Sequence, residues 1–204
     1  MTVPDQSLLI VEDDRALAGY LAAALAEQGY VVTKAHDRAE ALAHLALHTH
    51  PRLVLLDLGL PPAPSAMTEG LALLDECVAT WPLIKIIVLT GQDESAAAHE
   101  AVRRGAFDFL VKPASVASIT QALNRAALFV REELRMADAG EARVHLTARL
   151  SEGPKEAAAS AEEQLVRRAL TETGYNVADA ARRLGMAREH VYYYLNKYGI
   201  RRPG

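Results

Sequence analysis

The sequence predicts an α/β domain, with a five-stranded parallel sheet covered by helices on both faces, followed by a small all-α domain. Three observations support this prediction. Five short apolar runs alternate with amphipathic helical patterns between residues 8 and 130, as in parallel sheets. Residues 160–204 contain only helical patterns separated by glycines. The charge also changes, from 9 basic and 15 acidic side chains in residues 1–130 to 8 and 5 in residues 160–204, which indicates two modules.

The elements of the first domain follow from periodicity. Strands are predicted at the apolar runs 8–11, 30–35, 53–56, 84–90 and 106–111. Leucines and alanines recur at helical spacing between these runs, which predicts helices over 14–28, 68–80 and 93–104, one that Asp37 caps, and one from Ser115 onward. Gly29 and Gly105 follow two of these helices and are expected to end them.

Composition limits the class of protein. No run approaches the roughly 18 to 20 apolar residues of a membrane span, and the N-terminus lacks the basic flank of a signal peptide. A single cysteine, Cys77, excludes an internal disulfide and is expected to be a helix residue near the core of the domain. We therefore expect a cytoplasmic protein.

Polar side chains follow four of the five predicted strands, at the point where each strand ends. They are Glu12, Asp13 and Asp14 after the first, Asp57 after the third, Thr90 at the end of the fourth, and Lys112 after the fifth. Because the carboxyl ends of parallel strands share one edge of a sheet, where ligands bind, we expect these groups to converge.

Carboxylates that lie together repel one another, and a hard divalent cation such as Mg²⁺ relieves the repulsion. Asp13 and Asp57 are expected to supply oxygen ligands, and Glu12 to hold a water molecule. The remaining oxygen of Asp57 can attack a phosphoryl group, with Lys112 and Thr90 stabilising its charge. Helix capping by the acids and a surface role for Lys112 would explain each position separately, but not their coincidence at one edge.

The segments IVEDD, LLDLGLP, VLTG and FLVKP, in this order, resemble the receiver domain of bacterial two-component response regulators. The resemblance implies a flavodoxin-like, doubly wound fold and Mg²⁺-dependent phosphorylation of Asp57 by a sensor histidine kinase. It also implies that the Gly59 carbonyl contacts the metal and that the Lys112–Pro113 bond is cis. Phe109 would swing inward as Thr90 turns to the phosphate.

Two features of this domain keep alternative interpretations. Pro61 lies nine residues before Gly70, whereas in the receiver family the corresponding proline and glycine are about four residues apart. Either the longer loop tunes the phosphoryl lifetime or the choice of kinase, or it is a tolerated surface insertion. His44 and His48 have the spacing of helical metal ligands, but an exposed helix face explains them without any metal.

Residues 131–159 are predicted to be a helical extension and linker, with 137–158 as the linker proper. An apolar stripe at Leu123, Ala127, Val130 and Leu134 continues the last helix of the sheet domain, as a handle between domains or a dimer seam. Alternating apolar residues over 144–150 also fit a short strand.

Residues 160–204 are predicted to form three helices. Ser160 with Glu163 has the spacing of a capping box at the first helix, and Gly174 would end it. Asn176 would cap the second helix, and Gly185 would form the turn to a third that ends at Gly199. A short helix, a glycine turn and a second helix are typical of a helix-turn-helix.

The segments TGYN, AARRLGM and LNKYGI resemble the Fis-type helix-turn-helix. The resemblance implies a homodimer on double-stranded DNA, with Arg188 and Tyr192 at base edges and Asn176, His190 and Tyr193 at the DNA backbone. The order of domains is similar to that of compact two-domain regulators, such as the redox regulators of photosynthetic bacteria, although their proline-run linker is absent. No G-x-x-x-x-G-K motif indicates the central ATPase of larger activators.

The sequence thus predicts a DNA-binding transcriptional response regulator rather than an enzyme. The alternative is an adaptor whose phosphorylation-switched helical tail binds a protein instead of DNA.

Overall fold

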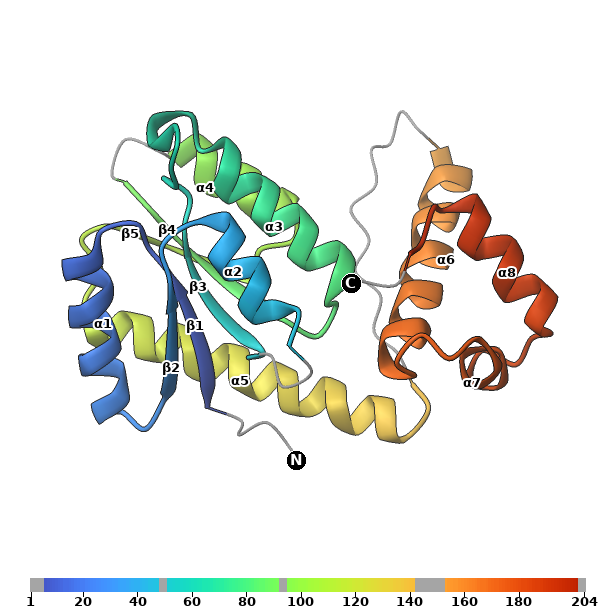
Figure 1. Cartoon of the computed structure of the whole chain (residues 1–204). Helices are drawn as coiled ribbons and strands as arrows, with labels where there is room; N and C mark the ends of the chain where they lie inside the picture. The colour runs from blue at the N-terminus through green and yellow to red at the C-terminus, as the bar shows by residue number, and fades with distance from the viewer. Residues whose placement is uncertain (1–5, 48–50, 92–94, 142–152, 202–204) are drawn as a thin grey trace. The chain divides into compact units, whose positions relative to one another are not determined.

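The computed structural model describes residues 6–47, 51–91, 95–141 and 153–201 (Figure 1). Its contacts divide the chain into two compact units, one of Met1–Val78 with Leu83–Glu132 and the other of Ala79–Pro82 with Glu133–Gly204. Within the described residues, no helix is long and apolar enough to cross a membrane.

The first unit is built on a five-stranded parallel sheet in the order β2-β1-β3-β4-β5. Its strands are β1 (Ser7–Val11), β2 (Val31–Ala35), β3 (Leu53–Asp57), β4 (Lys85–Thr90) and β5 (Asp108–Val111). The predicted strands are confirmed within one residue except that β5 begins at Asp108 instead of residue 106. Ala106 still donates its N–H to the Ala101 carbonyl, which closes the preceding helix, so the strand cannot begin there.

Helices cover both faces of this sheet, which makes the fold doubly wound as expected (Figure 1). On one face lie α1 (Arg15–Glu27) and α5 (Val116–Asp138), and on the other lie α2 (Arg38–Leu45), α3 (Thr68–Thr80) and α4 (Ser95–Arg103). The central strands β1 and β3 are buried on both sides, as expected for parallel strands. Cys77 of α3 is also buried.

Two helix caps position the chain where it leaves the sheet: the predicted one at Asp37 and one at Asp14, where the alternative explanation of the acid as a cap applies. The Asp14 carboxylate accepts hydrogen bonds from the N–H groups of Ala16 and Leu17, at 2.8 and 3.1 Å. Asp37 accepts one from Glu40 N–H at 2.8 Å. Such caps satisfy N–H groups that have no partner inside the helix. Asp14 is therefore used in folding and does not belong with the neighbouring acids that are free for chemistry.

The loop between β3 and α3 is closely packed where it meets α3. It contains a cis bond between Pro61 and Pro62 and a 3₁₀ turn at Pro64–Ala66. Gly70, in the first turn of α3, lies against the backbone of Leu58, where an added Cβ would come within 2.5 Å of the Leu58 Cα and carbonyl oxygen. The helix can approach the end of the sheet this closely only because residue 70 has no side chain.

The second unit contains α6 (Gly153–Glu172), α7 (Val177–Arg183) and α8 (Arg188–Lys197), here called the tail helices. The prediction that Ser160 caps the first of them is wrong, because α6 begins at Gly153 and Ser160 lies inside it. Pro154 sits in the first turn, where its missing N–H has no cost, and the alanine-rich stretch that follows favours helix. The proposed strand at 144–150 lies outside the described residues.

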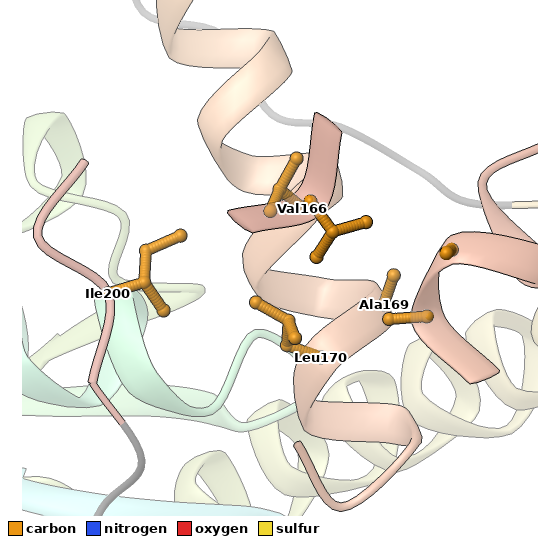
Figure 2. Packing of buried hydrophobic residues seen from close by; sticks show 7 residues of the cluster. Val166, Ala169, Leu170 and Ile200 are labelled. Atoms are coloured by element: carbon orange, nitrogen blue, oxygen red, sulfur yellow. The ribbon is translucent and has the colours of Figure 1, made fainter. Parts of the chain in front are cut away.

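The tail helices share a small apolar core (Figure 2). Val166, Ala169 and Leu170 of α6 face Ile200 and the buried side chains of α7 and α8. Burying an aliphatic side chain of this size contributes about 1.5 to 3 kcal/mol. The turn between α7 and α8 contains Gly185 at φ 64°, a left-handed conformation that glycine adopts at little cost. The packed core and this turn fix α8 with one face inward and the other free.

Candidate functional site

Three carboxylates meet at the carboxyl edge of the sheet. Glu12 follows β1 and Asp57 ends β3, and the register of these neighbouring strands pairs Val11 with Leu56, so both acids leave the sheet at the same level. One oxygen from each of Glu12, Asp13 and Asp57 lies within 4.8 Å of the others. Glu12 is buried, Asp57 is half-buried and Asp13 is exposed, so the cluster opens to solvent on one side.

Lys112 bridges two of these acids. Its Nζ lies 2.8 Å from Glu12 Oε2 and 2.9 Å from Asp57 Oδ2. Burial of Glu12 raises the pKa of its carboxyl, and the charge of Asp57 acts in the same direction, while the ammonium of Lys112 opposes both. Burial also acts to lower the pKa of Lys112, but its bonds to Glu12 and Asp57 outweigh burial and raise that pKa. Lys112 is therefore a fixed cation beside Asp57.

Thr90 ends β4 with a buried hydroxyl that has no hydrogen-bond partner among the described residues. Its carbonyl oxygen accepts the Lys112 N–H at 2.6 Å, which ties the end of β4 to the residue that follows β5. The expected cis bond between Lys112 and Pro113 is present. A buried hydroxyl without a partner is costly unless a ligand satisfies it, so this edge is suited to receive a polar group.

Two further predicted residues are Gly59, which contacts Asp57, and Phe109, whose strand is separated from that of Asp57 by β4. The Gly59 N–H donates a 3.3 Å hydrogen bond to Asp57 Oδ1. Because Oδ2 contacts Lys112, both oxygens of Asp57 are oriented by the chain. Phe109 lies half-buried in β5, three residues before Lys112.

The donor set fits a magnesium ion. Carboxylate oxygens are the protein ligands that Mg²⁺ prefers, usually one or two with water completing the shell. Three carboxylates against the single ammonium of Lys112 leave excess negative charge at the cluster. An incoming phosphoryl group would increase that charge, and a bound cation would offset it.

Sequence reasoning missed His36 at this edge. It follows β2, and its ring Nδ1 lies 2.9 Å from the backbone carbonyl oxygen of Glu12. Its backbone N–H donates to Glu40 Oε2 at 2.8 Å. The signal that could have identified His36 was its position directly after a strand, the criterion that selected the acids. Its contact fixes the backbone of Glu12. Of the two histidines with metal-ligand spacing, His48 lies outside the described residues.

The exposed face of α8 carries the other group of predicted residues. Arg188 is the first residue of the helix, and Tyr192 lies one turn later with 56% of its surface exposed. His190 and Tyr193 are exposed as well, whereas Val191 is fully buried in the tail core. Helix α7, the turn at Gly185 and α8 form the predicted helix-turn-helix.

Asn176 has a different position from the rest of that group. Its side-chain oxygen accepts hydrogen bonds from the N–H groups of Ala178 and Asp179, at 3.0 and 3.3 Å, and so caps α7 as predicted. Its oxygen is occupied by this cap, which leaves its side-chain NH₂ as the group that can meet a phosphate.

Comparison with known families agrees with both parts. Residues 8–124 match the response regulator receiver domain, and residues 157–198 match the bacterial regulatory protein, Fis family. The acid tolerance regulatory protein ActR of Rhizobium meliloti is 38% identical over 120 residues, which are 59% of this chain and 59% of ActR. The nitrogen assimilation regulatory protein NtrX of Azorhizobium caulinodans is 32% identical over 130 residues, covering 63% of this chain and 28% of NtrX.

Solved structures give the same likeness. The receiver domain of NtrX from Brucella abortus is similar with a TM-score of 0.55 and 32% identity, over 59% of this chain and 98% of that one. NtrX from the same organism in complex with ADP is similar with a TM-score of 0.60 and 26% identity, over 87% of this chain and 39% of that one. The chain spans less than two thirds of the length of the curated relatives named above.

Proposed function

The chain belongs to the response regulators, with a receiver domain and a Fis-family domain, and we propose that it regulates transcription under the control of phosphorylation at Asp57. The phosphoryl donor is a sensor histidine kinase, and the reaction requires Mg²⁺. The observation that carries the proposal is the convergence of Glu12, Asp13, Asp57 and Lys112 at one sheet edge.

In this proposal, one oxygen of Asp57 attacks the phosphorus of a phosphohistidine. A phosphorus–oxygen bond forms, the phosphorus–nitrogen bond breaks, and the electron pair returns to the imidazole of the kinase. Asp13 and Asp57, with the Gly59 carbonyl, would hold Mg²⁺, and Glu12 would hold a water molecule of its shell; the ion would supply positive charge that neutralises the transferred oxygens. Lys112 already lies 2.9 Å from Asp57 Oδ2 and can move to a phosphoryl oxygen.

The unsatisfied hydroxyl of Thr90 provides the switch. A phosphoryl group on Asp57 offers this buried hydroxyl an acceptor, so phosphorylation favours the conformation in which Thr90 turns toward it. The Phe109 ring, which is half-buried in this structure, then moves into the space that the Thr90 side chain has left.

The tail helices carry the output. We take residues 1–130 as the receiver domain, 131–159 as the extension and linker, and 160–204 as the DNA-binding domain of a cytoplasmic homodimer. Arg188 at the start of α8 contacts base edges together with Tyr192, and His190, Tyr193 and the Asn176 amide contact the DNA backbone. A helix that enters the major groove contacts bases through residues near its N-terminus, which is where Arg188 lies.

Phosphorylation is tested by incubating the full chain with a small acyl phosphate and Mg²⁺ and measuring the intact mass. We expect one added phosphoryl group, lost in Asp57→Asn and after chelation of Mg²⁺. Asp75→Asn, which changes an aspartate on α3 that pairs with Arg104, is the matched control and should label normally. Equal labelling of Asp57→Asn would contradict the assignment.

DNA binding is tested on a footprinted site and on scrambled duplex. Arg188→Ala should weaken specific binding by about 1 to 3 kcal/mol and random binding by less. Lys155→Ala, which removes one exposed charge from α6, controls for net charge. If the wild type, phosphorylated or not, binds no duplex, the helices serve the alternative adaptor function instead.

A further inference from the structure

Most cations of the tail helices are already neutralised inside their own domain. The ion pairs are Arg167–Glu163, Arg168–Glu172, Arg182–Asp179, Arg183–Glu172 and Lys197–Glu162. Within the described part of the tail, Lys155, Arg188 and Arg201 have no ion pair. Fewer positive charges of the tail are therefore available to a DNA partner than its number of basic side chains indicates.

The pair at Lys197 is the most elaborate of these. Glu162 of α6 accepts hydrogen bonds from two residues of α8 and from the residue that follows this helix. The donors are Lys197 Nζ at 2.6 Å, Tyr194 OH at 2.8 Å and Tyr198 OH at 2.5 Å. The Lys197 ammonium also lies over the rings of Tyr193, Tyr194 and Tyr198, with centroid distances of 5.8, 5.5 and 4.8 Å. One carboxylate therefore organises the C-terminal end of α8.

Other contacts also join α6 to the C-terminal end of α8, so the fold of the tail does not depend on Glu162. The Ala159 carbonyl lies 3.2 Å from Tyr198 OH and offers that hydroxyl a second acceptor, and Arg167 donates to the Tyr198 carbonyl at 3.2 Å. Tyr194 and Tyr198 also stack, with ring planes 3° apart. The tail can therefore keep its fold when the charge of Glu162 is removed.

The pKa shifts of the cluster agree with an ion pair between Glu162 and Lys197. The Lys197 ammonium, with the hydroxyls of Tyr198 and Tyr194, lowers the pKa of Glu162 to about 2. Glu162 in turn raises the pKa of Lys197. Both groups are charged throughout the physiological range of pH. Glu162 is therefore the ionic partner of Lys197, in the place that a DNA phosphate would otherwise take.

We propose that Glu162 is a specificity-determining residue of the DNA-binding helix, because it withholds Lys197 from the DNA backbone. A lysine on phosphate strengthens binding to every sequence alike and adds no discrimination. With Lys197 neutralised, the free positive charge of α8 is concentrated in Arg188 at the base-contacting end. This inference rests on the proposed function, since it requires that the tail helices bind DNA.

The experiment compares salt dependence for the full chain on specific and scrambled duplex. Glu162→Gln keeps the shape and the acceptor oxygen for the tyrosines but frees Lys197. We expect scrambled DNA to bind more tightly, the ratio of specific to scrambled affinity to fall, and the slope of log affinity against log salt to steepen by about 0.9. Glu156→Gln removes an equal charge from the first turn of α6 and should leave that slope unchanged.

Lys197→Met in the otherwise unchanged chain is the second variant. Since Lys197 is already neutralised, this change should leave the slope of log affinity against log salt unchanged. Combined with Glu162→Gln, it should cancel the tighter binding of scrambled DNA that Glu162→Gln alone produces. A slope shallower by about 0.9 in the single variant Lys197→Met would overturn the inference, because Lys197 would then contact phosphate in the wild type.

A measurement without DNA separates this inference from the proposed function. Acylation by an amine reagent, followed by mass spectrometry, should modify Lys197 more slowly than the exposed Lys155, and Glu162→Gln should accelerate it. If the wild type binds no duplex, the proposed function fails whatever the acylation rates. If duplex binding is normal but Lys197 reacts as fast as Lys155, only the present inference fails.

Discussion

Replacing Gly70 by alanine should destabilise the receiver domain, although alanine is the better helix former. In the interior of a helix, glycine to alanine usually stabilises by roughly 0.5 to 1 kcal/mol. At position 70 the new Cβ would lie 2.5 Å from the Cα and the carbonyl oxygen of Leu58. These are backbone atoms of the segment that follows Asp57, and they cannot move aside like the end of a side chain.

The expected magnitude follows from the size of this overlap. Overpacking of a filled site costs about 1 to 3 kcal/mol and exceeds the gain in helix propensity. We expect a net loss of about 2 kcal/mol, which moves the urea midpoint down by about 1 M if the slope is near 2 kcal/mol per M. The same displacement would disturb Asp57 and slow its phosphorylation.

Gly19 provides the matched control. It also lies inside a helix, α1, but an added Cβ there would meet nothing within 4 Å. Gly19→Ala should therefore raise the urea midpoint. Unfolding can be followed by circular dichroism in the far ultraviolet. A Gly70→Ala protein as stable as the wild type, beside a stabilised Gly19→Ala, would refute the close-packing argument.

Three further outcomes are expected. Burial raises the pKa of the Cys77 thiol to about 12, so iodoacetamide at pH 8 should label it only after unfolding, and rapid labelling of the native chain would contradict its burial. Asn176→Ala should cost the tail about 1 kcal/mol by removing the cap of α7, whereas Asn176→Asp should retain most of that stability in thermal melts. Burial raises the pKa of Tyr30 above its ordinary 10.0, so its contribution to stability is complete below pH 10 and is lost as the pH rises through the folded-state pKa. Stability of Tyr30→Phe should decline less steeply above pH 10 in urea titrations, and an equal decline would exclude Tyr30 as a cause.

The sequence predicted the main features of the receiver domain because they depend on local rules. Parallel strands end at one edge, so Glu12, Asp57 and Lys112 had to meet wherever five strands alternate with helices. Caps such as Asp14 and Asp37 act within three residues of themselves and are visible in the sequence.

Local rules failed where two signals competed. Ser160 has the spacing of a capping box, but the alanine-rich stretch before it extends the helix back to Gly153. Pro154 lies within the linker predicted over 137–158, yet α6 begins at Gly153, because in a first turn proline has no hydrogen bond to lose. Position along the chain could not decide between these signals, because helix propensity accumulates over a window whereas a cap depends on one residue.

Contacts between distant residues were decided by the tertiary structure alone. His36 meets the carbonyl of Glu12, and Glu162 meets Lys197 across 35 positions in the chain. The sequence determined which charges the tail carries, but not which of them remain available to DNA, because pairing depends on distances that arise only when α6 packs against α8. The physical reason is that electrostatic interactions are set by separation in space and by exposure to solvent, whereas the patterns of a sequence report only separation along the chain.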